Sequence, residues 1–464
     1  MLAKVRTFLF RDSHLNWSLA DQAVVSGVNF LTGLMLARFL GMAEFGRYSL
    51  AWMIVLFANS IQIALILEPM MSIGPKQPVD TQRAYYTALA IQQAALSLVM
   101  AGIIAGGVWW TGINMPGWKT TGLALPLACV VVSFQFQEFL RRYFFCIGRP
   151  RLAMVSDMVR YFGQIALLVA LVIVATGPTT PAVHVTSITA LWTIAAAGAI
   201  ATLMSVPFFI RPRFEWHILR SSMGRHWQSS KWLLPSAIIY WFSGHFFIIA
   251  AGFFLGAAAV GAIRAAQNLI AITHILFQAW ENIVPARAAR LFHSQGTHAL
   301  RAFLKRVAFN GGLATTAIIV AVNIQPGALL GMVFGAEYAE YGHLLFYYGL
   351  CYIFLFFSLP LKAGLRAVEN TKLIFLGHLA VSIFTLATFH PLVTTFGLDG
   401  AMAGIVCTSL ILVVVLYLGL RRILTRLEQD EHVMPDMEAD NTDRAPPPPP
   451  TPPTAHTVIE RSGS

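Results

Sequence analysis

The chain alternates between long apolar runs and short polar stretches over most of its length. A helix needs about 20 apolar residues to cross the hydrocarbon core of a bilayer, which is about 30 Å thick. Windows of this length predict twelve membrane spans, and therefore an all-α polytopic membrane protein. The predicted spans are 17–40, 48–69, 85–107, 122–140, 153–176, 185–210, 232–255, 263–285, 307–328, 343–361, 373–391 and 399–420.

One short turn of the chain occurs twice. The stretch LARFLGMAEFGRYSLAW, residues 36–52, joins the first two spans, and a glycine in it can adopt the left-handed conformation that ends a helix. Six of its positions recur 215 residues later (254 minus 39). Phe39, Leu40, Gly41, Ala43, Phe45 and Gly46 correspond to Phe254, Leu255, Gly256, Ala258, Val260 and Gly261. The repeat predicts two lobes of six helices related by a parallel repeat, an arrangement typical of transporters that bind their substrate between the lobes.

The spans and the polar stretches between them predict five regions. These are a cytoplasmic leader at 1–16, an N-terminal lobe at 17–210, a cytoplasmic interlobe loop at 211–231, a C-terminal lobe at 232–420 and a tail at 421–464. The leader lacks the long apolar core of a cleaved signal. The tail has a basic start, an acidic stretch and the run APPPPPTPP, so we predict a disordered cytoplasmic segment. A docking site for a proline-binding partner is the alternative interpretation.

The composition excludes a soluble globule. Hydrophobic residues make up 57% of the chain and charged residues only 11%, whereas soluble domains have about 25% charged residues. The mean hydropathy is +0.66. Of the 32 Lys and Arg residues, 27 lie on the side of the termini, and only Arg47 and Lys119 lie in the opposite loops. By the positive-inside rule both termini are cytoplasmic, and the same asymmetry explains most of the net charge of +11 without a nucleic-acid partner.

Several predicted spans carry polar stripes. An ionisable side chain in hydrocarbon costs at least about 2.5 kcal/mol, so these residues must face protein or water. The eighth span holds the largest set on one helical face, Arg264, Gln267, His274, Gln278 and Glu281. Smaller stripes occupy the fifth span, with Asp157, Arg160 and Gln164, and the first, with Gln22, Ser26, Asn29 and Gly33. We interpret these faces as the walls of a central cavity. Hydrogen bonding to neighbouring helices is the alternative.

Two stretches carry a family resemblance. The run LARFLGMAEFGRYSLAWMI, which follows the polar helix LADQAVVSGVNFLTG, resembles the opening of the polysaccharide-exporter branch of the multidrug/oligosaccharidyl-lipid/polysaccharide flippase superfamily. The stretch 329–345, LLGMVFGAEYAEYGHLL, is similar to that family's hairpin between helices nine and ten. The resemblance covers roughly residues 10 to 420. It implies a bacterial inner-membrane flippase that moves a polyprenyl-diphosphate-linked oligosaccharide outward for surface-polysaccharide assembly, alongside a polysaccharide polymerase and export machinery.

Candidate roles follow from residue chemistry. Arginine grips phosphate oxygens bidentately, so Arg264 and then Arg160 are the main candidates for holding a diphosphate. Arg38, near the outer end, either binds cargo or caps the hairpin. Further cavity candidates are Gln267, His274, Gln278 and Asn29. The candidates for a coupling ion or proton are Asp157, Glu281, Asp21 and His245. An internal ion pair between Asp157 and Arg160 is an equal alternative.

No motif indicates catalysis. The chain has no HExxH, GxSxG, Walker-type phosphate loop or GxGxxG after a strand, and its four cysteines are far apart and predict neither a metal site nor a disulfide framework. We therefore predict a non-enzyme without cofactor, driven by an ion gradient, the membrane potential or the substrate's own gradient. Two rivals remain open: a small-molecule or drug exporter of the same superfamily, and a membrane-embedded glycan polymerase or ligase. No predicted outer loop has room for the acceptor domain that such an enzyme needs.

Overall fold

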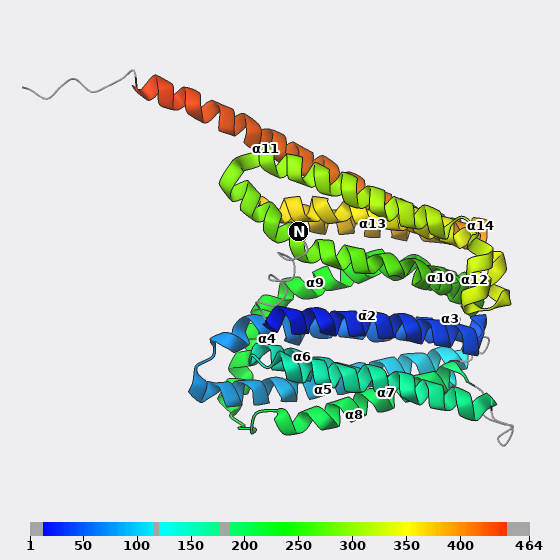
Figure 1. Cartoon of the computed structure of the whole chain (residues 1–464). Helices are drawn as coiled ribbons and strands as arrows, with labels where there is room; N and C mark the ends of the chain where they lie inside the picture. The colour runs from blue at the N-terminus through cyan, green and yellow to red at the C-terminus, as the bar shows by residue number, and fades with distance from the viewer. Residues whose placement is uncertain (1–12, 115–119, 177–184, 443–464) are drawn as a thin grey trace, which may run out of the picture.

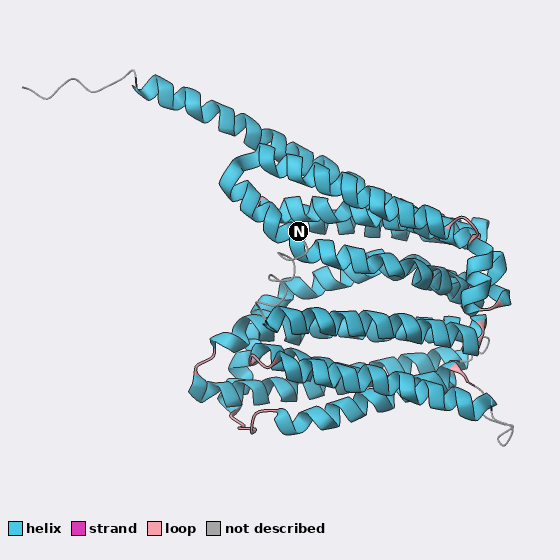
Figure 2. Cartoon of the chain, in the orientation of Figure 1, coloured by secondary structure: helices cyan, strands magenta, loops and turns pink. Residues whose placement is uncertain are grey.

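The computed structural model describes residues 13–114, 120–176 and 185–442, and every regular element in these ranges is a helix (Figure 2). The helices form two lobes that lie side by side (Figure 1). The N-terminal lobe consists of α2 (Ser13–Leu40), α3 (Met42–Gln62), α4 (Glu68–Ile73), α5 (Val79–Asn114), α6 (Ala124–Cys146), α7 (Pro150–Thr176) and α8 (Ser187–Ser205). The C-terminal lobe consists of α9 (Trp216–Leu255), α10 (Ala257–Ile270), α11 (His274–Val322), α12 (Pro326–Phe334), α13 (His343–Ala367) and α14 (Lys372–Thr442).

The predicted spans all coincide with helical segments, which confirms the fold class. Within the described ranges, nine helices are long and apolar enough to cross a membrane by length and composition. Two continuous helices each turn back on themselves at a glycine with positive φ, namely α11 at Gly296 and α14 at Gly397. The turn in α11 is visible at the left of Figure 1. Because of these turns, one helix label can hold two of the predicted passes.

Two boundaries differ from the sequence-based expectation. The ninth span ends at Val322, and Pro326 starts the separate short helix α12, because proline fits the first turn of a helix. The stretch 211–231, expected as a loop, is helical from Trp216. The leader falls largely on residues 1–12, which lie outside the described residues.

The tail also differs from the prediction, since α14 continues through residues 421–442. Its first turns have tertiary partners. Leu424 is buried in a cluster with Leu304 and Leu365, and Arg301 Nη2 lies 3.2 Å from Glu428 Oε2. Apolar burial and an ion pair therefore extend the helix beyond the membrane span. The proline run lies outside the described residues.

Helix α9 connects the two lobes. Its first half packs on the N-terminal lobe, where Ser230 Oγ donates to the carbonyl of Ala64 (2.8 Å) and Tyr85 Oη lies 2.9 Å from His226 Nε2. Ala64 belongs to a π-helical turn, η1 (Ile63–Leu67), whose altered hydrogen bonding offers its carbonyl to the serine. The second half packs against α14 of the C-terminal lobe. Pro235 lies between the halves and removes one helical hydrogen bond there.

The repeated turns meet each other at one end of the molecule, at the right of Figure 1, which we call the tip end. Helices α3 and α10 cross there with backbone against backbone. A Cβ atom on Gly46 would lie 1.7 Å from the carbonyl oxygen of Ala257, and one on Gly261 would lie 2.1 Å from that of Met42. These four residues are related by the 215-residue repeat, so the contact has pseudo-twofold symmetry. Only glycine permits this approach.

We expect Gly46→Ala and Gly261→Ala each to destabilise the chain, because inserting a methyl group into a filled contact costs about 1–3 kcal/mol. Thermal melting of the purified protein in detergent measures the effect. Gly244→Ala is the matched control, since a Cβ on that helical glycine meets nothing within 4 Å. Equal melting temperatures for Gly46→Ala and the control would contradict the assigned contact.

Candidate functional site

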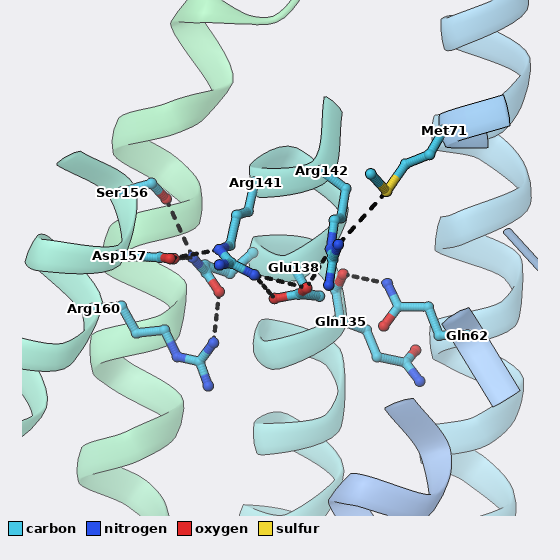
Figure 3. Close-up of polar contacts among 10 residues, drawn as sticks. Gln62, Met71, Gln135, Glu138, Arg141, Arg142, Ser156, Asp157 and Arg160 are labelled. Atoms are coloured by element: carbon cyan, nitrogen blue, oxygen red, sulfur yellow. Dashed lines mark hydrogen bonds and ion pairs between the residues drawn. The ribbon is translucent and has the colours of Figure 1, made fainter. Parts of the chain in front are cut away.

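The N-terminal lobe contains a buried charged network (Figure 3). Arg160, only 2% exposed, donates from Nη1 to Gln137 Oε1 (2.6 Å). The amide nitrogen of Gln137 donates in turn to Asp157 Oδ1 (2.6 Å), and Asp157 Oδ2 lies 2.5 Å from Arg141 Nε. Glu138 pairs with Arg141 (3.2 Å) and Arg142 (2.9 Å). The predicted pair of Asp157 and Arg160 is thus bridged by a glutamine that holds both.

A second buried network adjoins the first. It joins α3, α5 and α6 through side-chain amides and one hydroxyl. Gln62 Nε2 donates to Gln93 Oε1 (3.0 Å), Gln93 Nε2 to Ser97 Oγ (2.7 Å), and Ser97 Oγ to Gln135 Oε1 (2.8 Å). Each of these four residues is at most 1% exposed. Such bonds satisfy polar groups that would otherwise be costly in hydrocarbon.

In the C-terminal lobe, Arg264 lies on α10 close to the tip contact. Its Nη1 donates to Gln267 Oε1 (2.6 Å), one helical turn away. Its buried Nε has no hydrogen-bond partner in the described part of the chain. No acidic side chain in that part forms an ion pair with it. The guanidinium is therefore half-buried without a compensating negative charge.

The two predicted arginines lie on a shared aromatic strip. Tyr48 on α3 lies near both Arg160 and Arg264. It stacks on Trp52 (ring centroids 6.2 Å apart), and Trp52 makes an edge contact with Phe134 (5.6 Å). The Arg160 guanidinium carbon lies 4.1 Å from the centroid of the Phe134 ring. The strip thus joins a cation of each lobe across the interlobe boundary.

Arg38 belongs to a clamp between the lobes at the tip end. Its Nη1 donates to the carbonyls of Met332 (3.0 Å) and Val333 (3.3 Å) at the C-terminal end of α12, where helix carbonyls lack internal partners. Glu337 Oε1 accepts from the Met42 backbone N–H (3.0 Å), and Tyr338 Oη donates to the carbonyl of Ala37 (3.1 Å). Arg38 therefore bonds the C-terminal end of α12 in the opposite lobe, and not its own α2–α3 hairpin.

The remaining candidates are spread over the C-terminal lobe and α2. His245 Nδ1 donates to the carbonyl of Trp241 (3.0 Å), and its imidazole interacts electrostatically with Arg264. Glu281 is exposed and interacts electrostatically with Tyr240 and Lys362. Lys362 lies one residue beyond the predicted tenth span, so sequence reasoning missed it.

Helix α2 carries two of the predicted polar-stripe positions that the structure describes, Asn29 and Gly33. Asn29 is exposed. A Cβ on Gly33 would lie 2.2 Å from Asn268 Nδ2, so α2 passes close to α10 at this point. Gln164, from the fifth-span stripe, donates to Thr32 Oγ1 (3.0 Å) of α2. The side chains of Asp21, Gln22, Ser26, His274 and Gln278 lie outside the described ones.

A pocket of about 770 Å³ lies between the lobes at the tip end. Helices α3, α5 and α6 wall it on one side, and the α9–α10 turn on the other. Its lining is mainly apolar, with Arg47, Thr111 and Thr120 as polar members. It adjoins the residues of the repeated turn, including Ala43 and Ala258.

Sequence reasoning missed the polar residues of α6. The stretch QFQEFLRR, residues 135–142, holds members of both networks, and Gln135, Glu138 and Arg142 have the helical spacings of 3 and 4, but the stretch crosses the predicted end of the span at residue 140. The feature that could have identified them is the number of amide and charged side chains at the end of an otherwise apolar span. No cluster of three metal-binding side chains occurs among the described residues, and all four cysteines are free thiols.

Comparison with known proteins places the fold. No family model matches the chain, and neither does any curated protein. The structure is similar to the lipid II flippase MurJ in an inward closed conformation (TM-score 0.68, 10% identity, 90% of this chain and 91% of that one). It is also similar to a multidrug resistance MATE family transporter in an inward-facing conformation (TM-score 0.62, 15% identity, 87% of this chain and 95% of that one). A third similar structure is a MOP superfamily transporter from Pyrococcus furiosus (TM-score 0.59, 14% identity, 88% of this chain and 94% of that one).

The chain therefore has the fold of MOP superfamily transporters, a multi-pass membrane fold. This agrees with the superfamily that the sequence resembles. The structural neighbours are transporters and flippases, and none of those cited is an enzyme. At these sequence identities the likeness extends to the fold only.

We expect Gln137→Met to destabilise the N-terminal lobe. The substitution keeps the side-chain length but removes the groups that bond Arg160 and Asp157, and a buried polar group that loses its partner costs about 1–3 kcal/mol. Gln295→Met, at an exposed position of α11, is the matched control. Melting in detergent should separate the two variants. Identical stability would show that Gln137 does not hold the network together.

Proposed function

We propose that the chain is a bacterial inner-membrane flippase that moves a polyprenyl-diphosphate-linked oligosaccharide to the outer leaflet for surface-polysaccharide assembly. The observation that carries the proposal is the uncompensated guanidinium of Arg264 at the interlobe boundary. A half-buried cation without an acidic partner is costly, and a bound anion relieves that cost. A diphosphate supplies two anionic groups that fit the arginine fork.

The arrangement around Arg264 suits an amphipathic cargo. Trp52, the partly exposed ring of the aromatic strip, gives a sugar a flat apolar surface to stack on, whereas Tyr48 and Phe134 are buried. Arg160 lies at the other end of this strip, held by Gln137, so it supplies positive charge without needing to move. In this proposal the polyprenyl chain remains in the bilayer. The pockets of the described residues therefore do not need to hold the whole cargo.

Transport by alternating access fits the contacts between the lobes. The tip end is closed by glycine contacts and by the Arg38 and Glu337 clamp. Opening this end requires the lobes to tilt apart, and α9 bends at Pro235 because that turn already lacks a helical hydrogen bond. In this account the structure is the inward-facing state and receives cargo from the cytoplasmic leaflet.

A small-molecule exporter is the second candidate. A cationic drug calls for an available carboxylate; Asp157 is already paired with Arg141 and bonded by Gln137, whereas the exposed Glu281 forms no ion pair with a described residue. The solved transporter from Pyrococcus furiosus is described as having a binding pocket of reverse polarity that suggests a different function. The arginines of this chain favour an anionic cargo. A polymerase and export machinery are the expected partners.

Arg264→Ala should abolish flipping while the protein stays folded and inserted. Arg264→Lys should recover only part of the activity, because an ammonium keeps the charge but loses the bidentate fork. Export of the lipid-linked oligosaccharide per inserted molecule measures the effect in proteoliposomes. Arg290→Ala, an exposed position on α11, is the control. Unchanged export in Arg264→Ala would remove this residue from the site.

The proposed orientation has its own test. In a chain with all four cysteines replaced, single cysteines at Asn114 and Glu340 should react with a membrane-impermeant thiol reagent in intact spheroplasts. Cysteines at Arg211, Gly224 and Gln295 should react only after permeabilisation. All five positions are exposed, so reactivity reports sidedness. The reversed pattern would invert the topology without affecting the fold.

A further inference from the structure

A second pocket lies in the C-terminal lobe, away from the interlobe boundary. It has a volume of about 600 Å³ and is enclosed by the second half of α11, by α13 and by the last part of α14. It lies toward the end of the molecule opposite the tip end, because its α11 residues follow the Gly296 turn and its α14 residues include the start of the C-terminal extension. It shares no lining residue with the interlobe pocket.

The pocket is lined by both apolar and basic side chains. Its walls include Leu304, Ala308, Phe357, Leu361, Val413 and Leu420. Its rim carries Arg301, Lys305 and Arg421. Arg301 is engaged by Glu428 and by Thr425 Oγ1 (3.4 Å), whereas Lys305 and Arg421 are exposed and form no ion pair with any described residue. Two cations are thus available above an apolar slot.

We propose that this pocket binds an anionic glycerophospholipid from the surrounding membrane. The phosphate would lie between Lys305 and Arg421, and an acyl chain would occupy the apolar slot. Basic pockets between membrane helices on the cytoplasmic side are suited to anionic headgroups, because the cytoplasmic leaflet concentrates such lipids. The volume is typical of a ligand site, for which about 300–1,000 Å³ is usual. The inference uses the proposed orientation but is independent of the proposed cargo.

The pocket also has a structural reason to be filled. Leu304 and Leu420 converge on Gly364, where a Cβ would lie 2.7 Å and 2.8 Å from their methyl groups, so the base of the slot is tightly packed. Pro360 also lines the pocket, and a proline within a helix leaves a carbonyl one turn earlier without its usual donor. A lipid seated here would bridge α11, α13 and α14. We therefore expect the lipid to stabilise this lobe.

The test uses the full chain purified in a neutral detergent. Native mass spectrometry with added dioleoylphosphatidylglycerol or dioleoylphosphatidylcholine compares two lipids with the same chains and different headgroup charge. We expect the anionic lipid to bind at least about tenfold more tightly. Lys305→Gln combined with Arg421→Gln should remove this preference. Arg290→Gln combined with Arg422→Gln changes the net charge equally at exposed positions outside the pocket and should preserve it.

Two further experiments test whether binding requires the acyl chain as well as the charged headgroup. Ala308→Trp keeps every charge but fills the slot, so it should weaken the anionic lipid about as much as the double glutamine variant. Soluble glycerol 3-phosphate should not compete, because it lacks the chain. Three results would each overturn the proposal. They are equal binding of the two lipids, an equal loss of the preference for the anionic lipid in the two double variants, and competition by glycerol 3-phosphate. Thermal melting confirms that every variant compared is folded.

Discussion

The architecture depends on one contact, the crossing of α3 and α10 through Gly46 and Gly261. Each glycine faces a carbonyl oxygen of the opposite lobe, so the two backbones touch where any side chain would push them apart. Small residues allow such approach within membranes, where apolar burial alone does not drive helices together. The clamp of Arg38 and Glu337 adds directional hydrogen bonds around this contact. The tip end therefore holds the lobes together while the rest of the boundary carries the polar site.

The polar residues of the two lobes meet different physical demands. In the N-terminal lobe, Asp157 and Glu138 pair with Arg141 and Arg142, and Gln137 joins the third arginine, Arg160, to Asp157. Such a network stabilises and orients its members. In the C-terminal lobe Arg264 has an amide partner but no negative charge. This contrast is the basis for proposing that the anion bound during transport approaches Arg264 first, with Arg160 as a fixed source of positive potential.

Much of this fold could be predicted from the sequence because the bilayer imposes a simple constraint on length and hydropathy. The spans and the parallel repeat follow from that constraint, and the repeated glycines proved to be the residues in contact. The turns at Gly296 and Gly397 fall in the gaps predicted between spans, at 286–306 and 392–398, but hydropathy did not show that each break is a single glycine with helix on both sides. The Gln137 network joins α6 to α7 through space, and the spacing of residues along one helix does not show which helix packs beside it. The hydrogen bonds of Arg38 depend on a partner about 295 residues away.

The central claim is that the tip end must open for transport. A reducible crosslinker between cysteines at Phe39 and Met332, exposed residues on either side of the clamp, tests it most directly. Crosslinking should stop translocation of the lipid-linked oligosaccharide in proteoliposomes, and reduction should restore it. A crosslink between Met332 and Glu340, both in the C-terminal lobe, should leave transport unchanged. Full transport with the first crosslink in place would contradict the account.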